Sequence, residues 1–138
     1  MTSIHDHCLT ELAIKVNERQ ILLRTAFPEQ TGPEFAEVVF DGVEAYLLNG
    51  DAFGTILFDI EEVDALTLYK DWAKEMQDAF SQSGGNSAWV ASDSSAVEFL
   101  SGSDVRGYQV SCSIGLNGVV WARQLTIRAL DAMGLRTG

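Results

Sequence analysis

The sequence has few residues that could cross-link its fold or place it in a membrane. Its 138 residues include only two cysteines and two prolines. Cys8 and Cys112 are too few for a disulfide framework, and because both lie in apolar, strand-like segments we interpret them as reduced core thiols. No stretch approaches the roughly 20 apolar residues that span a bilayer. The first ten residues lack the basic start and apolar centre of a signal peptide, so we expect a cytoplasmic protein.

Basic residues are also scarce. Nine lysines and arginines stand against 20 aspartates and glutamates, and the formal net charge is -11. A field of this sign repels nucleic acids and anionic lipid surfaces, so we expect neither as a partner. Cations and basic proteins are the partners that it favours.

The side chains needed for catalysis are few. There is no G-x-S-x-G motif, and His5 and His7 are the only histidines that could act as a base. These two histidines and Cys8 have the ligand types that zinc prefers, but a closed tetrahedral site would need carboxylates or a partner chain to complete it. We therefore predict a non-enzymatic protein without a metal site or a cofactor. Residues 1–7 are expected to be a mobile N-terminus.

The length and the apolar pattern predict one α+β domain over residues 1–138. Turn signals at Asp41-Gly42, Asn49-Gly50-Asp51 and Asn117-Gly118 should join neighbouring strands as hairpins. The expected sheet is an antiparallel meander of about six to seven strands. The segments whose apolar and polar residues favour strands are 9–16, 20–27, 35–40, 43–48, 55–60, 108–114 and 119–127, with a short one at 89–91.

One long amphipathic helix is predicted over about residues 63–82, packed on one face of the sheet. Asp64 is a suitable N-cap because its carboxylate can accept a hydrogen bond from a free backbone N–H. Residues 92–95 and 101–104 are interpreted as loops, and the three tryptophans as core. Spacings of three and four place one apolar stripe along the helix, formed by Leu66, Tyr69, Ala73, Met76 and Phe80.

The acidic residues are distributed unevenly. Between residues 25 and 69 there are ten acids and no lysine or arginine. A group of acids at 59–64 could act as a general acid–base pair or hold a divalent cation, but exposure on a strand and the helix dipole explain it without a function. Because side chains alternate along a strand, several acids should share one face. The residues predicted to bind a partner are Glu37, Asp41, Glu44, Asp59 and Glu62.

Two parts of the sequence resemble a known group of proteins. The runs FDGVEAY at 40–46 and TILFDIEE at 55–62 resemble a pattern in small, largely uncharacterised bacterial proteins. The run SCSIGLNGVVWA at 111–122 is similar to their C-terminal hairpin, with Cys112 and Ser113 where a pair of serines is expected. These acidic α+β proteins include members suspected of being immunity proteins of toxin systems. The shared residues are turn and core residues, so the resemblance implies a fold and brings no catalytic or ligand residue.

Three hypotheses for the function follow. The first is a protein-binding domain, of the immunity or inhibitor type, that presents its acidic face to a basic partner. The second is a small-molecule or cation-binding domain with a pocket between sheet and helix, lined by Trp72, Tyr69 or Trp121. The third is a homodimer or larger homo-oligomer that pairs an exposed strand edge across a two-fold axis.

Overall fold

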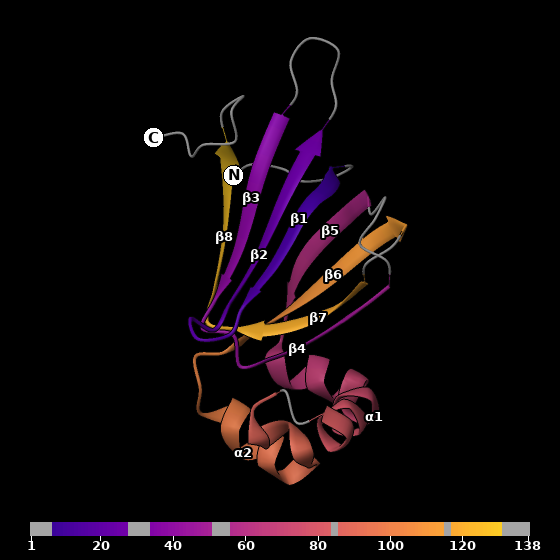
Figure 1. Cartoon of the computed structure of the whole chain (residues 1–138). Coiled ribbons are helices and arrows are strands. Elements are labelled where there is room, and N and C mark those ends of the chain that lie inside the picture. Colours follow the sequence, from indigo (N-terminus) through magenta and orange to yellow (C-terminus); the bar gives the residue numbers. More distant parts are fainter. Residues whose placement is uncertain (1–6, 28–33, 51–55, 84–85, 115–116, 131–138) are drawn as a thin grey trace.

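The computed structural model describes residues 7–27, 34–50, 56–83, 86–114 and 117–130, and in these residues it contains eight strands and two α-helices (Figure 1). The α+β class predicted from the sequence is confirmed. The strands are β1 (Cys8–Lys15), β2 (Gln20–Phe27), β3 (Glu34–Asp41), β4 (Ala45–Asn49), β5 (Ile56–Val63), β6 (Arg106–Ile114), β7 (Asn117–Ala122) and β8 (Gln124–Leu130). The helices are α1 (Ala65–Ser83) and α2 (Asp93–Ser101), with a 3-10 turn, η1, at Ala88–Ala91 between them.

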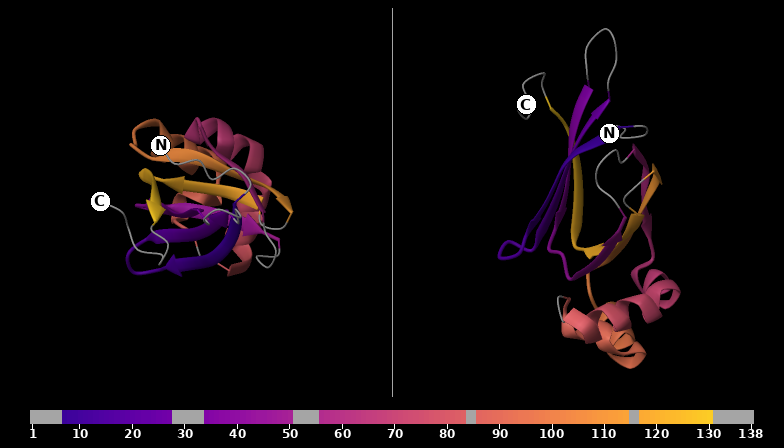
Figure 2. Two further views of the ribbon diagram at one scale, coloured as in Figure 1. Left: turned by 90° about the horizontal axis from the view of Figure 1, so that it is seen from above. Right: turned by 45° about the vertical axis from the view of Figure 1, so that its right-hand side comes forward.

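The strands are antiparallel and follow the order β4-β7-β6-β5-β1-β2-β3-β8. This order contains two four-stranded half-sheets, β4-β7-β6-β5 and β1-β2-β3-β8, because β1 and β5 share only one paired position, Cys8 with Ile56. The half-sheets face each other (Figure 2). A first core fills the space between them, and its buried residues are Ile21, Leu23, Ala36, Val38, Phe40, Val43, Tyr108, Val110, Val120 and Ala122.

The predicted six- to seven-stranded meander with one helix is wrong. Gly42 has φ +63 and Gly50 has φ +107, as the turn signals require, but Asp41 lacks the positive φ that a type I′ turn at Asp41-Gly42 would also need. These turns do not form hairpins, however, because β3 pairs with β2 and β8, and β4 pairs with β7. The physical reason is that β4 is apolar on both faces. Ala45 and Leu47 face the helices while Tyr46 and Leu48 face the first core, so β4 lies between two cores instead of beside β3.

Helix α1 matches the predicted helix over 63–82 closely. Asp64 caps it, because its Oδ2 accepts hydrogen bonds from the Thr67 amide at 3.0 Å and the Thr67 hydroxyl at 2.9 Å. Helix α2 was not predicted. It begins after Ser92, whose Oγ accepts a hydrogen bond from the Ser95 amide at 3.2 Å. Ser92 is therefore the N-cap, and the rest of the serine-rich segment interpreted as a loop forms the first turn of α2.

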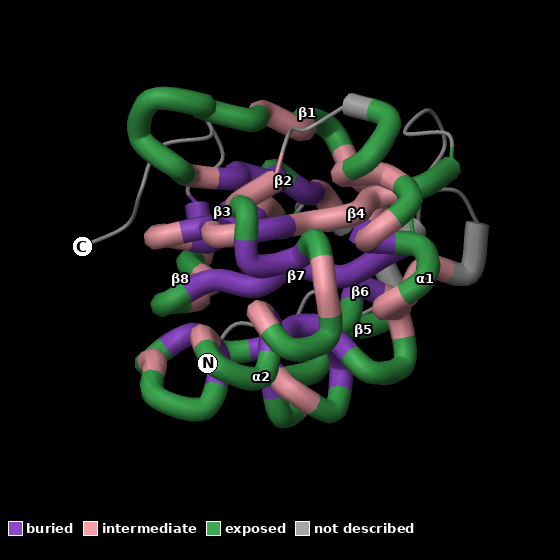
Figure 3. Tube along the Cα trace, turned by 90° about the horizontal axis from the view of Figure 1, so that it is seen from below, coloured by how far each residue is buried: buried purple, intermediate pink, exposed green. Residues whose placement is uncertain are grey.

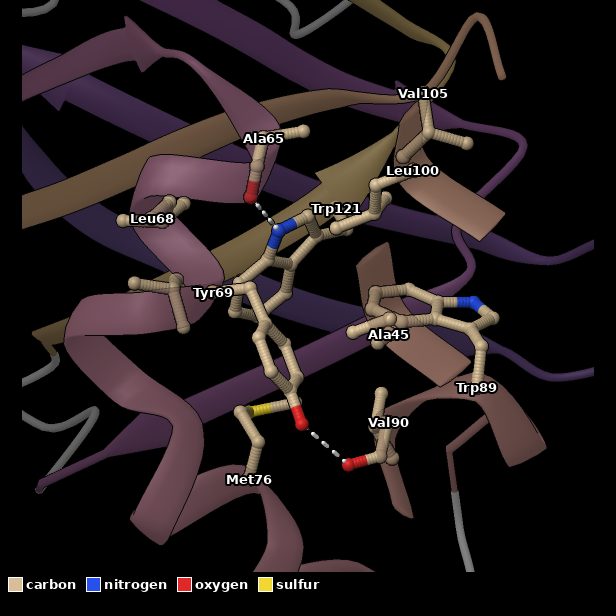
Figure 4. Close-up of a cluster of buried hydrophobic side chains, with 12 residues drawn as sticks. Ala45, Ala65, Leu68, Tyr69, Met76, Trp89, Val90, Leu100, Val105 and Trp121 are labelled. Carbon is tan, nitrogen blue, oxygen red and sulfur yellow. Dashed lines mark hydrogen bonds between the residues drawn. The ribbon is translucent and has the colours of Figure 1, made fainter. Parts of the chain in front are cut away.

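The helices lie at one end of the sheet, and a second core joins them to β4 and β7 (Figures 1 and 4). Trp121 is fully buried at its centre and donates from Nε1 to the carbonyl oxygen of Ala65 at 3.0 Å. Its ring contacts Tyr69 and Trp89 with centroids 6.4 and 6.1 Å apart. The Tyr69 hydroxyl donates to the Val90 carbonyl at 2.8 Å. These contacts fix α1 and η1 to the outer face of β7.

Burial follows the two cores along the chain. Figure 3 shows buried stretches along β3 and β7, whereas the turn between β1 and β2 is exposed. Of the segment expected to be mobile, residues 1–6 lie outside the described residues. His7 is buried, and its Nδ1 lies 2.8 Å from Thr25 Oγ1. Cys8 and Cys112 are both half-buried and form no disulfide with each other.

Candidate functional site

A groove of about 630 Å³ opens between β8 and the strands β5 and β6. Its walls include apolar side chains from both half-sheets: Ile60 and Tyr108 from one, Leu125 and Ile127 from the other. These residues also pack against the first core, so the groove is an open margin of that core. Its polar lining residues are Glu62, Arg106, Arg123, Gln124 and Thr126.

Strand β8, on one side of the groove, is an edge of the sheet. It pairs with β3 from Asp41↔Gln124 to Phe35↔Leu130, and no other described strand pairs with it. On an edge strand, alternate N–H and C=O groups point away from the sheet and are available to another chain. Between residues 124 and 130 there is no proline, lysine or acidic residue, and Arg128 is the one charged side chain that could protect this edge.

The opposite edge strand, β4, is protected. The Tyr46 amide donates to Asn86 Oδ1 at 3.0 Å. Just before the strand, the carbonyl oxygen of Glu44 accepts hydrogen bonds from the amide of Ser87 at 3.2 Å and from its hydroxyl at 2.7 Å. The segment before η1 therefore covers this edge, and the two edges of the sheet differ in their access to a partner.

The polar end of the groove carries an ion pair and a buried phenol. Arg106 Nη1 lies 3.3 Å from Glu62 Oε1, and both side chains are more than half exposed, so this pair contributes little to stability. Tyr108 is 2 % exposed. Burial raises the pKa of the Tyr108 hydroxyl, and the nearby charge of Glu62 raises it further. The charge of Arg106 opposes the rise in pKa without reversing it, so the protonated phenol, which is already the form present at neutral pH, is favoured further.

Glu44 connects this end of the groove to the helices. Its Oε2 lies 2.7 Å from Arg123 Nη1, and its Oε1 accepts hydrogen bonds from Ser87 Oγ at 3.0 Å and Trp89 Nε1 at 3.4 Å. Arg123 also lies 3.1 Å from Asp104. Burial opposes ionisation of Glu44, but the hydrogen bonds from Arg123, Ser87 and Trp89 outweigh it and hold the pKa of this carboxyl below its usual value.

We expect Glu44→Gln to make the free energy of unfolding fall less steeply as the pH is lowered. A lowered folded-state pKa stabilises the fold above the unfolded value of about 4.3, and this stability is lost as the pH falls through the folded value. Urea unfolding at several pH values should show the variant less stable than the wild type at neutral pH, with the difference shrinking in acid. Glu61→Gln is the control, because Glu61 is exposed and has no ion pair within the described part of the chain. A difference that stays constant with pH would contradict the prediction.

The five acids predicted to bind a partner lie in different surroundings. Glu37 is buried on β3, with Arg24 at 3.3 Å, and Asp41 accepts a hydrogen bond from Gln20 at 2.8 Å. Asp59 is exposed and accepts a hydrogen bond from the next amide in the chain. Glu44 and Glu62 come nearest to a common site, because their partners Arg123 and Arg106 line the same groove. The five do not form one acidic patch.

Arg106, Arg123 and strand β8 form the part of the site that sequence reasoning missed. The pairing of Glu44 with Arg123 and of Glu62 with Arg106 joins acids of the first half to basic residues of the second. Opposite charge in the two halves was visible in the sequence. The strand order that brings these residues together was not, because the turn between β7 and β8 at Arg123 falls inside the segment predicted as one strand over 119–127.

The structure has a pocket beside the helix, but its position and lining residues differ from those predicted. A cavity of about 280 Å³ lies between α1 and α2, and Tyr69 is among its lining residues. The other side chains that line it are Leu66, Lys70, Ala73, Asp93 and Val97. Trp121 lies in the second core, and neither Trp121 nor Trp72 lines this cavity.

Groups for metal binding are not assembled in the residues that the structure describes. No three His, Cys, Asp or Glu side chains among them are placed to hold a metal ion. Burial lowers the pKa of His7, although Glu34 at 3.6 Å opposes this shift.

None of the described helices is both long and apolar enough to cross a membrane. Comparison with protein-family models, with curated proteins and with solved structures finds no match for the chain.

Proposed function

We propose that the chain is a non-enzymatic protein-binding domain that adds an extended segment of a partner to β8, over the groove. The observation that carries this proposal is the difference between the two sheet edges. Asn86 and Ser87 cover β4, whereas β8 is paired on one side only within the described residues. Main-chain hydrogen bonds to a free edge supply affinity in this mode of recognition, and pockets for alternate side chains supply specificity.

The groove provides such pockets. Leu125 and Ile127 are two residues apart on β8, so their side chains lie on the same face. A partner strand beside β8 would direct every second side chain toward them and toward Ile60 and Tyr108. Because Ile60, Leu125 and Ile127 are only partly buried, apolar partner side chains would bury additional apolar area there.

The charge of the chain favours a basic partner. A net charge of -11 attracts basic proteins over long distances and raises the rate of encounter. Glu62, at the groove, is more than half exposed and paired with Arg106 only by a solvent-exposed contact, so a basic residue of the partner could compete for it. Inhibition of a basic enzyme, as an immunity protein does, is one role that such a domain would serve.

A second candidate function is the binding of a small amphipathic molecule in the same groove. Ligand pockets usually have about 300–1,000 Å³ and combine apolar walls with a few polar groups. The groove, with about 630 Å³ and the Tyr108 ring in its wall, falls in this range. Strand addition is favoured because it also uses the edge of β8 beside which no other described strand lies.

A peptide-display selection tests the proposal. Panning against the wild-type protein should recover extended peptides with alternating apolar side chains and a positive charge. Amide shifts in NMR spectra should map them to β8. Ile127→Gln, in the groove, should weaken binding about tenfold or more, because it places a polar side chain in an apolar contact.

Arg128→Gln is the matched control, because Arg128 is exposed, lies on the same strand and is not among the residues that line the groove. It should bind the selected peptides nearly as well as the wild type. Selection of no peptide, or equal loss in both variants, would contradict strand addition. Binding of the dye 8-anilinonaphthalene-1-sulfonate that is lost only in Ile127→Gln, without any peptide binder, would favour the small-molecule function.

A further inference from the structure

A second, smaller cavity lies at the turn between β1 and β2. It has a volume of about 130 Å³ and is bounded by this turn, the connection between β3 and β4, and Asn86. The turn is exposed in Figure 3, and Val16 is 79 % and Ile14 42 % exposed. The apolar side chains that line the cavity are Ile14, Val16, Ile21 and Val43, and the basic ones are Lys15 and Arg19. The remaining lining residues are polar or aromatic: Gln20, Glu44, Tyr46 and Asn86.

Arg19 is held in a conformation that a side-chain-bearing residue rarely adopts. Its φ is +50, in the left-handed region that favours glycine. Contacts across the cavity wall hold it there. The Val43 amide donates to the Arg19 carbonyl oxygen at 2.9 Å, and Arg19 Nη1 donates to the Val43 carbonyl oxygen at 3.1 Å. Nη1 also lies 3.4 Å from Ser87 Oγ. The guanidinium is therefore oriented before any ligand arrives.

One edge of this guanidinium is unused. Both side-chain hydrogen bonds of Arg19 start from Nη1, and its Nε and Nη2 groups make none within the described part of the chain. Arg24, Arg106 and Arg123 each pair with a carboxylate, but Arg19 pairs with none of the described acids. Lys15 likewise has no described ion pair, and the Glu44 carboxylate is occupied by Arg123, Ser87 and Trp89.

We propose that this cavity binds a carboxylate attached to a short, branched apolar group. The Nε and Nη2 groups of an arginine form a planar fork that matches the two oxygens of a carboxylate. Ile14, Ile21 and Val43 supply an apolar wall for the rest of the ligand. A cavity of about 130 Å³ has room for a group somewhat smaller than benzene, since an engineered apolar cavity of about 150 Å³ binds benzene.

The charge of the chain limits the ligand to a small acid. A net charge of -11 repels anions at long range, so a singly charged group held by short contacts is favoured over a phosphate. Two sources share this chemistry: a free aliphatic acid and the C-terminal carboxylate of a peptide that ends in a branched residue. The cavity shares no lining residue with the groove, so the proposal is independent of strand addition at β8.

NMR titration of the isotope-labelled full chain tests the site. The probes are 3-methylbutanoate, its neutral amide, the dipeptide acetyl-Gly-Val and the C-terminal amide of that dipeptide. The acids should shift the amide signals of Ile14, Arg19 and Val43, and each neutral amide should bind about tenfold more weakly than its acid. Tighter binding of the dipeptide acid would assign the site to peptide C-termini, and tighter binding of 3-methylbutanoate to free acids.

Arg19→Gly and Arg19→Lys decide the role of the guanidinium. Glycine adopts the positive φ without strain, so Arg19→Gly should fold and lose binding of both acids by about tenfold or more. Arg19→Lys keeps the charge without the fork and should bind more weakly than the wild type. Lys70→Gln, which changes an exposed cation on α1, is the control. Unchanged binding in Arg19→Gly, equal affinity for acids and amides, or no shifts at this cavity would overturn the proposal.

Discussion

Trp121→Ala is expected to lower the free energy of unfolding by about 3–5 kcal/mol, the usual cost of removing a large buried aromatic side chain. Trp121 is fully buried, and its ring lies between Tyr69 of α1 and Trp89 of η1. From β7 its ring contacts both helical segments, and its Nε1 holds the first turn of α1 through Ala65, as Figure 4 shows. Because a domain of this size is typically stable by only about 5–15 kcal/mol, the variant should be close to unfolding.

Urea denaturation followed by far-UV circular dichroism measures the change. Trp121→Phe separates the hydrogen bond from the packing, because it keeps most of the ring but leaves the Ala65 carbonyl without this donor. Trp72→Ala is the matched control on α1, where the tryptophan is only partly buried, and it should cost about 1 kcal/mol. A Trp121→Ala variant as stable as Trp72→Ala would show that the helices do not depend on this contact.

Gly118→Ala should cost about 3 kcal/mol or more, at the upper end of the range for overpacked sites. A Cβ atom at this position would lie 1.9 Å from the carbonyl oxygen of Leu47 and 2.9 Å from the Cα atom of Leu48. Both atoms belong to the backbone of β4, which pairs with β7 at this point. No rotation of a side chain relieves such a contact, so β4 and β7 would have to separate.

Gly102→Ala is the control for Gly118. Gly102 follows α2 with φ -111, and a Cβ atom there would meet nothing within 4 Å. Alanine at this position should leave stability unchanged or raise it by about 0.5 kcal/mol, because it restricts the unfolded chain. Thermal unfolding of both variants compares them directly. Similar melting temperatures for the two would mean that β4 can move away from β7 at little cost.

Local structure was largely predictable from the sequence, and the arrangement of the strands was not. Periods of two and of three to four residues locate β1, β2 and α1, and Asp64 marks the start of that helix correctly. The signal at Asp41-Gly42 correctly required a positive φ at Gly42. Such a signal reports the backbone conformation of the turn and carries no information about which strands pair beyond it.

Long-range contacts explain why the candidate site was not predicted. The groove is formed by β8 with β5 and β6, and which strand lies opposite another is decided by burial of both faces in tertiary structure. The acids were interpreted from a run without basic residues, but Glu37, Glu44 and Glu62 have arginine partners from other parts of the chain. The sequence therefore suggested more unpaired negative charge around these acids than the folded surface carries.

The pairing of β3 with β8 sets an order of events while the chain is being made. Phe35 pairs with Leu130, so one side of β3 has no neighbour until the last of the described strands has emerged. β1, β2 and β3 can assemble early, because they are consecutive in sequence and pair in that order. During the interval, β3 presents an apolar edge strand of the kind that promotes misassembly of nascent chains. Pairings between distant segments also slow folding, so completion of this sheet should be the late step.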